Sequence, residues 1–588
     1  MSTLARIAVA VALVTMTTAH AASPGDRSFE ALSGRFVDEF PALSPVGATQ
    51  LGDHRFDGKL DEVSEEARAK EAAFLSRYLD ELSRIPRDSL SRANQVDAAL
   101  LSHSLRSQLW QLQTLREWAW NPLIYTGLAG GGIYGLMARE FAPLPSRLAH
   151  VSERLEQLPR FYEQVRGTLD PRRVPKVHAE TAIKQNRGLL SILSGMVRPG
   201  MEDLDEAPRE RLARAIETAS AAVERHQQWL EKELLPAAAG EFRIGEELFE
   251  RKLAFTLHTP LGRAEIRERA EREFDRVRRE MYDVAKSVYT DRYPMTTFPD
   301  APDESYRQAI IRAALEVAYE QLPGRDEIVE IARRNLEQTT AFVKEKELVS
   351  VPDDPVEIII MPEFQRGVAI AYCDSPGPLD AGQKTFYAVA PLPETWTDVE
   401  VRSFLREYNL LSIQDLTIHE AMPGHFLQLA HSNRYPSTLR AVLSSGPFVE
   451  GWAVYAEKLM VDEGYLDSDP LMRLINLKWY LRVVTNAIID QAIHCDGMTQ
   501  GEAMRLMVEG GFQEEREAAG KWVRAQLTST QLSTYFVGYQ EHADLRAEME
   551  GRDDVPFVSK EHHDKLLSFG SPPVQFVRAL LLGLPIPD

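Results

Sequence analysis

The chain has 588 residues, of which 44% are hydrophobic and 26% are charged, and its formal net charge is −21 at pH 7. This composition is that of a globular protein with a sizeable core, long enough for two or three domains. No run of Lys and Arg is present, which argues against nucleic acid or an anionic membrane as a partner, because both require clustered positive charge.

The first residues predict a secretory signal peptide over residues 1–21. Arg6 provides the positive start, residues 7–19 are apolar or small, and residues 19–21 read Ala-His-Ala, a suitable cleavage site. A membrane anchor is disfavoured, because about 20 apolar residues are needed to cross a bilayer. No Cys lies near the cleavage site, so a lipid anchor is not expected. We therefore expect a periplasmic or secreted protein without membrane contact once the signal is removed.

Residues 22–345 read as a helical N-terminal region. Apolar residues recur at three- and four-residue spacing with charges between them, a pattern typical of amphipathic helices. Pro- and Gly-bearing turns separate these segments, which disfavours an extended coiled coil. The predicted helices include residues 65–85, 146–169, 208–234 and 261–289.

Residues 346–588 are expected to form the catalytic region. Residues 355–362 and 384–393 are short runs of β-branched and aromatic residues and predict strands, whereas residues 372–383 predict a loop. Helices then resume to the end of the chain. The predicted fold is therefore mainly α, with many helices and a small β-sheet lining the active-site cleft. Cys373 and Cys495 are the two cysteines, and the sequence does not decide whether they pair.

The stretch "LTIHEAMPGHFLQLAH", residues 416–431, resembles a zinc-binding helix with one irregularity. In the usual motif two histidines stand four residues apart, on one face of a helix. His419 and His425 are six apart, which on an unbroken helix places them about 240° from each other. Pro423 forces the helix to open and Gly424 permits an unusual backbone, so a two-residue bulge can return His425 to the i+4 position.

A third ligand is expected in the helix predicted over about residues 449–463. Glu450 is followed by an apolar run in which an unpaired carboxylate would be costly, and Glu457 lies two turns further along the same face. We expect Glu450 on the metal and Glu457 behind it, orienting a histidine, although the sequence leaves open the reverse assignment. Taken singly, each of these residues also fits an ordinary solvated helix face.

Glu420, next to the first histidine, is the expected general base. A catalytic zinc has three protein ligands and an open fourth position for water. Glu420 would accept a proton from that water during attack on a carbonyl and pass it to the leaving amine.

These motifs resemble the bacterial family known as domain of unknown function 885. The words that carry the resemblance are "HEAMPGHFLQ", "FVEGWAVYAEKL", "IIDQAIHCDGMTQGEA" and "STYFVGYQEHADLR", and similarity extends over about residues 30–585. The family looks like a helical zincin, similar to the gluzincin-like zinc peptidases. The resemblance implies one Zn²⁺ per chain, bound by His419, His425 and Glu450, with Glu420 as the base.

The resemblance also suggests residues beyond the metal. His494 would donate to the developing oxyanion, with Asp490 one turn away in its second shell; the alternative is a buried histidine satisfied by Asp490. Tyr535 is a second candidate oxyanion donor, although tyrosines at this spacing are as often core residues. Expected substrate contacts are Tyr539 on the same helix face, and Phe386 and Tyr387 on an edge strand along which an extended peptide would lie.

The leading functional expectation is a zinc metallopeptidase, a carboxypeptidase or oligopeptidase, that acts on short peptides. One alternative is a zinc hydrolase of a modified amino acid or another non-peptide amide. Another is an inactive helical binding protein that carries a structural metal, which the presence of Glu420 disfavours. No arginine is identified as a carboxylate-binding residue, and the sequence indicates no oligomeric state.

Overall fold

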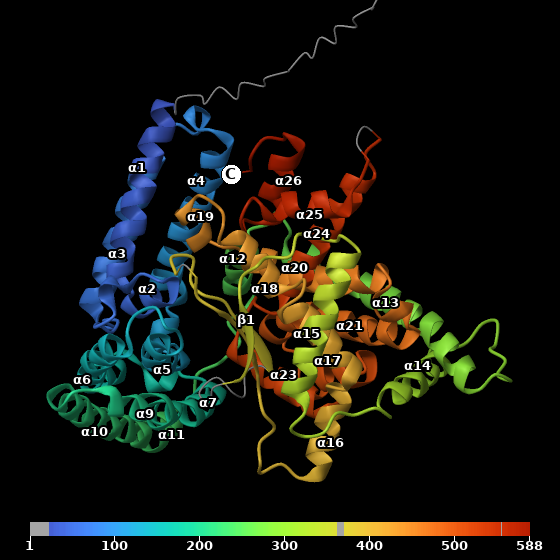
Figure 1. Cartoon of the computed structure of the whole chain (residues 1–588), viewed down its shortest axis with the longest axis horizontal. Coiled ribbons are helices and arrows are strands. Elements are labelled where there is room, and N and C mark those ends of the chain that lie inside the picture. Colours follow the sequence, from blue (N-terminus) through green and yellow to red (C-terminus); the bar gives the residue numbers. More distant parts are fainter. Residues whose placement is uncertain (1–22, 362–369, 381, 554–555, 588) are drawn as a thin grey trace, which may run out of the picture.

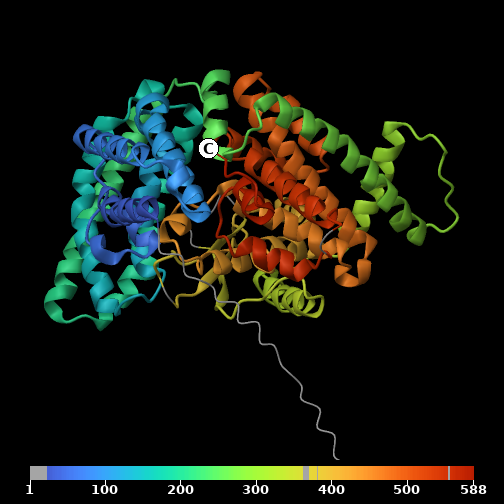
Figure 2. The same cartoon turned by 90° about the horizontal axis from the view of Figure 1, so that it is seen from above.

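The computed structural model describes residues 23–361, 370–380, 382–553 and 556–587. The predicted signal peptide lies outside these ranges. Helices dominate the described chain, and the helices of the N-terminal part form one lobe beside the lobe formed by the rest (Figures 1 and 2). The mainly α prediction is confirmed. Among the described residues, no helix combines the length and apolar character that a bilayer crossing requires.

The N-terminal lobe is held by two hydrophobic cores. The larger joins α5, α6 and α10, where side chains such as Leu155 and Leu158 of α6 and Ile216 of α10 are almost fully buried. The smaller joins α1, α3 and α4. The helices of this lobe are α1 (Pro24–Glu39), α2 (Pro45–Leu51), α3 (Glu65–Ser83), α4 (Arg92–Trp110), α5 (Leu123–Met137), α6 (Leu144–Thr168), α7 (Lys176–Asn186), α8 (Gly188–Ile192), α9 (Arg198–Gly200), α10 (Glu206–Trp229) and α11 (Leu235–Ala237).

The second lobe is built around one large core that runs from Phe249 to Val577. This core includes α12 to α15, so these helices, which precede residue 346, pack with the later part of the chain. The reason is that α13 and α14 pack against α21, a contact between distant segments that local composition does not reveal. Its first helices are α12 (Glu246–Leu257), α13 (Arg263–Arg292), α14 (Glu304–Ala318) and α15 (Ile328–Glu345).

The remaining helices carry the predicted site. They are α16 (Asp398–Glu407), α17 (Leu410–Glu420), α18 (His425–Ser432), α19 (Thr438–Val442), α20 (Gly446–Asp462), α21 (Pro470–Cys495), α22 (Gln500–Arg505), α23 (Glu515–Leu527), α24 (Ser533–Glu550), α25 (Ser559–Leu567) and α26 (Val574–Leu582).

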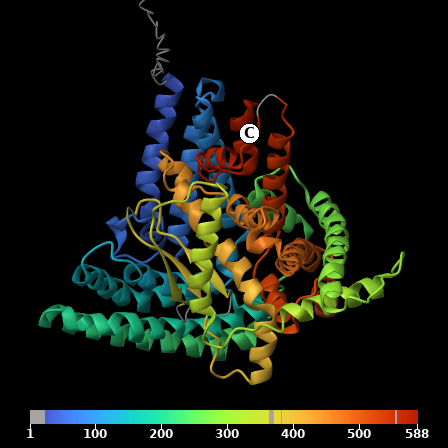
Figure 3. The same ribbon diagram turned by 45° about the vertical axis from the view of Figure 1, so that its right-hand side comes forward.

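A three-stranded sheet stands at the border of the two lobes, next to α15 (Figures 1 and 3). The strands are β1 (Val356–Ile360), β2 (Ala371–Asp374) and β3 (Thr385–Val389), in the order β1-β3-β2. β3 pairs in parallel with β1 and antiparallel with β2. The expectation that the segment 384–393 forms an edge strand is therefore wrong, because β3 is central. The predicted loop 372–383 begins with residues of β2, whose four residues are too few to show a strand pattern.

The N-terminal lobe contacts the chain that follows β2. Arg139 forms an ion pair with Asp374 at 2.7 Å, and His54 Nε2 lies 3.0 Å from Asp380 Oδ1. Burial lowers the pKa of His54, but Asp380 and Asp57 raise it to about 9, so this imidazole is charged and the contact is an ion pair at neutral pH. The N-terminal lobe thus fixes the sheet edge that faces α17.

Candidate metal centre

The two predicted histidine ligands lie on either side of a helix break. α17 ends at Glu420 and α18 begins at His425. The Gly424 N–H donates to the carbonyl of Ile418 at 2.9 Å, a span of six residues in place of the helical four, so two residues are looped out. The predicted opening of the helix at Pro423 is confirmed. The segment forms two separate helices, and not one helix with a bulge.

Gly424 is required by the close approach of the loop to α17. A Cβ at this position would lie 1.9 Å from the carbonyl oxygen of His419 and 2.3 Å from that of Ile418. The loop is also fastened from outside, because Trp452 of α20 donates its Nε1–H to the carbonyl of Pro423 at 2.9 Å. The sequence Pro-Gly therefore fixes where His425 enters the site.

The structure brings His419, His425 and Glu450 together, with ligand atoms that all lie within 4.8 Å of one another. Glu450 Oε2 is 3.7 Å from His419 Nε2 and 3.4 Å from His425 Nε2. Zinc ligands about 2.1 Å from the ion at tetrahedral angles are about 3.4 Å apart, so this donor set fits a zinc ion. Burial raises the pKa of Glu450, but the two imidazoles hold it well below its usual range, so this carboxylate is ionised.

Glu457 orients the first of these histidines. Its Oε1 lies 2.5 Å from His419 Nδ1, which directs the opposite nitrogen, Nε2, toward Glu450. The contacts therefore favour Glu450 as the ligand and Glu457 as the group behind it. His425 has no comparable support: its Nδ1 is buried without a hydrogen-bond partner among the described residues, so packing alone orients its ring.

Asp415, one turn before His419, lies behind Glu457 and interacts with it. Burial and the charge of Glu457 raise the pKa of Asp415 well above its usual value, so its carboxyl is protonated. As a carboxylate, its buried Oδ2 has no hydrogen-bond partner among the described residues, whereas a protonated Oδ2 can donate to Glu457. Asp415 thereby supports Glu457 in its contact with His419.

Glu420 stands beside the three ligands at the end of α17. It is only 7% exposed, and the N–H of Cys373 on strand β2 donates to its carboxylate. Burial and Glu450 raise its pKa above the usual value, despite the opposing effect of His419 and His425. A carboxylate with a raised pKa is better suited to accept and return a proton near neutral pH.

Tyr535 reaches the same site from α24. α20 and α24 touch through glycines, since a Cβ on Gly451 would lie 2.2 Å from the backbone of Gly538. Burial and the nearby charge of Glu450 raise the pKa of Tyr535, which keeps its hydroxyl protonated. Arg524 donates to this hydroxyl at 3.0 Å and Gln531 at 3.3 Å. With both lone pairs occupied, the proton of Tyr535 is free to be donated.

Asp490 and His494 hold the segment that carries these side chains. The Asp490 carboxylate accepts hydrogen bonds from the N–H of Thr530, at 2.9 Å, and from the N–H and hydroxyl of Ser533, at 3.0 and 2.8 Å. His494 donates its Nε2–H to the carbonyls of Ala525 and Thr528. His494 Nε2 is thus committed to the α23–α24 connection, and the described contacts include no hydrogen bond between His494 and Asp490.

The predicted substrate-binding residues are divided between different places. Tyr387 is fully buried on the face of β3 toward α17. Burial and the charge of Glu420 raise the pKa of its hydroxyl. Phe386 points to the other side, where the guanidinium of Arg139 lies 5.3 Å from its ring centroid. Tyr539 is buried against Tyr480, with ring centroids 4.6 Å apart. None of the three has a described contact with a metal ligand, and Tyr387 and Tyr539 are core residues.

Arg524, Gln531 and Asp415 are not predicted from the sequence. A signal for Arg524 was present: Lys521 and Arg524 stand three residues apart on one helix face, where like charges are unfavourable. No acidic residue lies three or four positions from Arg524.

Cys373 and Cys495 are both free thiols.

The chain is similar to one protein family and to solved structures of two bacterial proteins. Its residues 45–581 match the family described as "Bacterial protein of unknown function (DUF885)". A solved structure titled "putative lipoprotein of unknown function from Shewanella oneidensis" has 35% identity and a TM-score of 0.77, covering 94% of this chain and 99% of that one. A "putative lipoprotein from Colwellia psychrerythraea" shares the fold at 17% identity and a TM-score of 0.74, covering 95% and 99%. No curated protein matches the chain.

Proposed function

The chain belongs to the DUF885 family, and we propose that it is an exported zinc-dependent peptidase that hydrolyses short peptides. The observation that carries this proposal is the convergence of His419, His425 and Glu450 with Glu420 beside them. Two imidazoles and one carboxylate are the donor set of catalytic zinc in many peptidases, and they leave one position open. A structural site has no need of a buried carboxylate next to its ligands.

A zinc ion in this site would polarise the scissile carbonyl and lower the pKa of a water. The residues of the chain then have separate tasks. Glu420 holds the water, takes its proton and delivers it to the leaving amine. Tyr535, whose oxygen already accepts from Arg524 and Gln531, donates its proton toward the oxygen on which negative charge develops.

Strand β2 supports a peptide as the substrate. It is an edge strand, paired only with β3 among the described residues, and it runs past Glu420. An extended peptide can pair with such an edge through its backbone, which holds a scissile bond near the base without demanding particular side chains. His419 and His425 side chains are 12% and 11% exposed, so a flexible segment reaches them more readily than a folded protein surface does.

Export is part of the proposal. The predicted signal sequence supports it, as does the description of both structural relatives as putative lipoproteins.

Replacing Glu420 with Gln tests the mechanism. We expect the variant to retain zinc while hydrolysis of a mixed library of short peptides falls by about 10³-fold, because the proton acceptor is lost and the ligands are not. Glu561→Gln, an exposed position on α25, is the control. Zinc-loaded wild-type protein that cleaves no peptide in the library, measured by mass spectrometry, would contradict the proposal.

A further inference from the structure

Two basic side chains of α23 have no carboxylate partner among the described residues. Lys521 and Arg524 stand on α23, and neither forms an ion pair with a described residue. Arg524 uses one terminal nitrogen to donate to the neutral oxygens of Tyr535 and Gln531, each at 3.0 Å. Lys521 is only 5% exposed and makes no hydrogen bond with a described residue.

The carboxylates near this pair are already matched. Glu407 lies 2.8 Å from Lys478, and Glu517 lies 2.5 Å from Arg482. Burial, together with the guanidinium groups of Arg482 and Arg524, lowers the pKa of Lys521 well below its usual value. The surroundings of Lys521 thus disfavour its charged form, and a bound anion would favour it, since an opposite charge nearby stabilises an ammonium. Buried groups with such perturbed pKa values cluster at functional sites.

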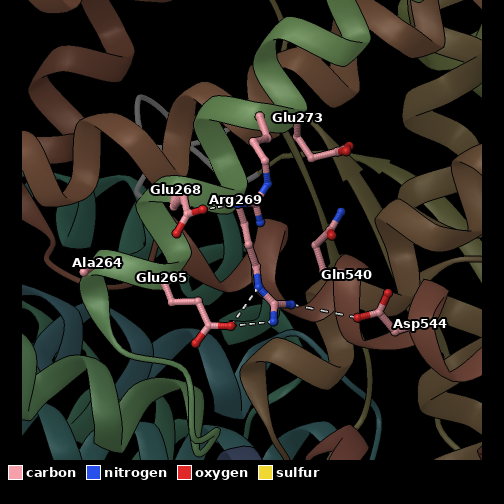
Figure 4. Close-up of a pocket in the computed structure, with 8 residues that line it drawn as sticks. Ala264, Glu265, Glu268, Arg269, Glu273, Gln540 and Asp544 are labelled. Atoms are coloured by element: carbon pink, nitrogen blue, oxygen red, sulfur yellow. Dashed lines mark hydrogen bonds and ion pairs between the residues drawn. The ribbon is translucent and has the colours of Figure 1, made fainter.

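A groove between α13 and α24 shows the opposite arrangement (Figure 4). This hollow of about 560 Å³ is lined by charged side chains, but its arginines already have partners. Arg269 pairs with Glu265 at 2.6 Å and lies 3.9 Å from Asp544, and Arg272 pairs with Glu268. An anion gains little there, whereas on α23 it would find the guanidinium of Arg524, which donates only to neutral oxygens, with Lys521 beside it.

The position of Lys521 and Arg524 indicates which kind of anion they would bind. Arg524 contacts Tyr535, and Glu450 acts electrostatically on both, so Arg524 lies along the same wall of the site as the proposed oxyanion donor. Lys521 stands three residues before it on α23 and acts electrostatically with it. In a peptide, the terminal carboxylate follows the last scissile carbonyl by one residue, about 3.5 Å along the chain. A guanidinium binds such a carboxylate through two parallel N–H groups.

We propose that Lys521 and Arg524 bind the free C-terminal carboxylate of the peptide, so that the enzyme removes residues from the C-terminus. This inference rests on the proposed peptidase function. It assigns the carboxylate-binding arginine that the sequence did not reveal, and it makes the enzyme a carboxypeptidase.

The experiment compares peptides that differ only at the C-terminal group. Zinc-loaded mature protein is given acetylated hexapeptides of mixed sequence, either as free acids or as C-terminal amides, and the products are identified by mass spectrometry. We expect release of the last residue from the acids at least tenfold faster than any cleavage of the amides. In Arg524→Gln and Lys521→Met this preference should fall to near one, and Arg524→Lys should retain part of it. The control Arg272→Gln, at an exposed cation that has its partner, should keep the full preference.

A binding measurement separates this inference from the proposed function. By calorimetry, zinc-loaded Glu420→Gln protein should bind acetyl-Ala-Ala-Phe-Ala at least tenfold more tightly than its amide, and addition of Arg524→Gln should abolish the difference. Equal binding of acid and amide overturns the inference, as does wild-type enzyme that cleaves both forms equally fast. Absence of all cleavage, with selective binding of the acid retained, would instead contradict the peptidase function. Thermal melting of each variant verifies that it is folded.

Discussion

The two walls of the site are built in different ways. The metal wall comes from residues 419–457, where spacing on α17, α18 and α20 and the Pro-Gly break place the ligands. The opposite wall comes from α23 and α24, and its side chains are placed by contacts from α21, through Asp490 and His494. The first wall follows local rules and the second depends on tertiary contacts, so changes to each should have separable effects on metal binding and turnover.

Gly424→Ala should have the largest effect on the metal wall. The added Cβ would lie 1.9 Å from the His419 carbonyl, so the loop must move and carry His425 with it. We expect zinc affinity to fall by about 100-fold or more, which a competitive chelator titration measures. Gly446→Ala is the matched control, because a Cβ there meets no atom within 4 Å. Unchanged zinc affinity in Gly424→Ala would mean that the loop does not set the ligand geometry.

Glu457→Gln should have a smaller effect on the same wall. Loss of the carboxylate at 2.5 Å from His419 Nδ1 weakens the orientation and basicity of that ligand. Zinc affinity is expected to fall by roughly 10- to 100-fold, the usual range for such partners. Glu463→Gln, at the end of the same helix, should leave affinity unchanged. If Glu457→Gln instead binds zinc as tightly as wild type, Glu457 does not orient the ligand.

Asp490→Asn should change the opposite wall while sparing the metal. An amide replaces one of two oxygens that accept hydrogen bonds from Thr530 and Ser533, which weakens the start of α24 by about 1–2 kcal/mol. We expect kcat to fall several-fold through misplacement of Tyr535, with zinc content unchanged. Zinc loss in this variant, measured by mass spectrometry, would show that the walls are not independent.

Acid should destabilise the contact between the two walls, and this is the smallest of the expected effects. Burial lowers the pKa of His542 and His562 to about 4, and His542 packs against Trp452 of α20, with ring centroids 5.9 Å apart. Their pKa in the unfolded chain is about 6.5, so the unfolded state takes up protons first as pH falls. The free energy of unfolding should therefore decrease from pH 6.5 to pH 4, and His542→Gln should reduce this slope in urea titrations. A slope that is the same in both proteins would contradict the assignment.

The sequence predicts the two walls unequally. The mainly α fold, the helix break at Pro423 and the grouping of His419, His425 and Glu450 follow from local spacing and backbone chemistry. Strand order does not, because β3 is central only through its pairing with both neighbours. His494 fits an oxyanion donor by motif, but two carbonyls brought by the α23–α24 connection take its proton.

The most direct test of the account is the zinc content of the purified mature protein beside a His425→Ala variant. We predict one zinc per chain in the wild type and its loss in the variant, since two remaining ligands do not hold the ion. No zinc in the wild-type protein, even after incubation with excess zinc, would contradict the metal centre and the peptidase mechanism with it.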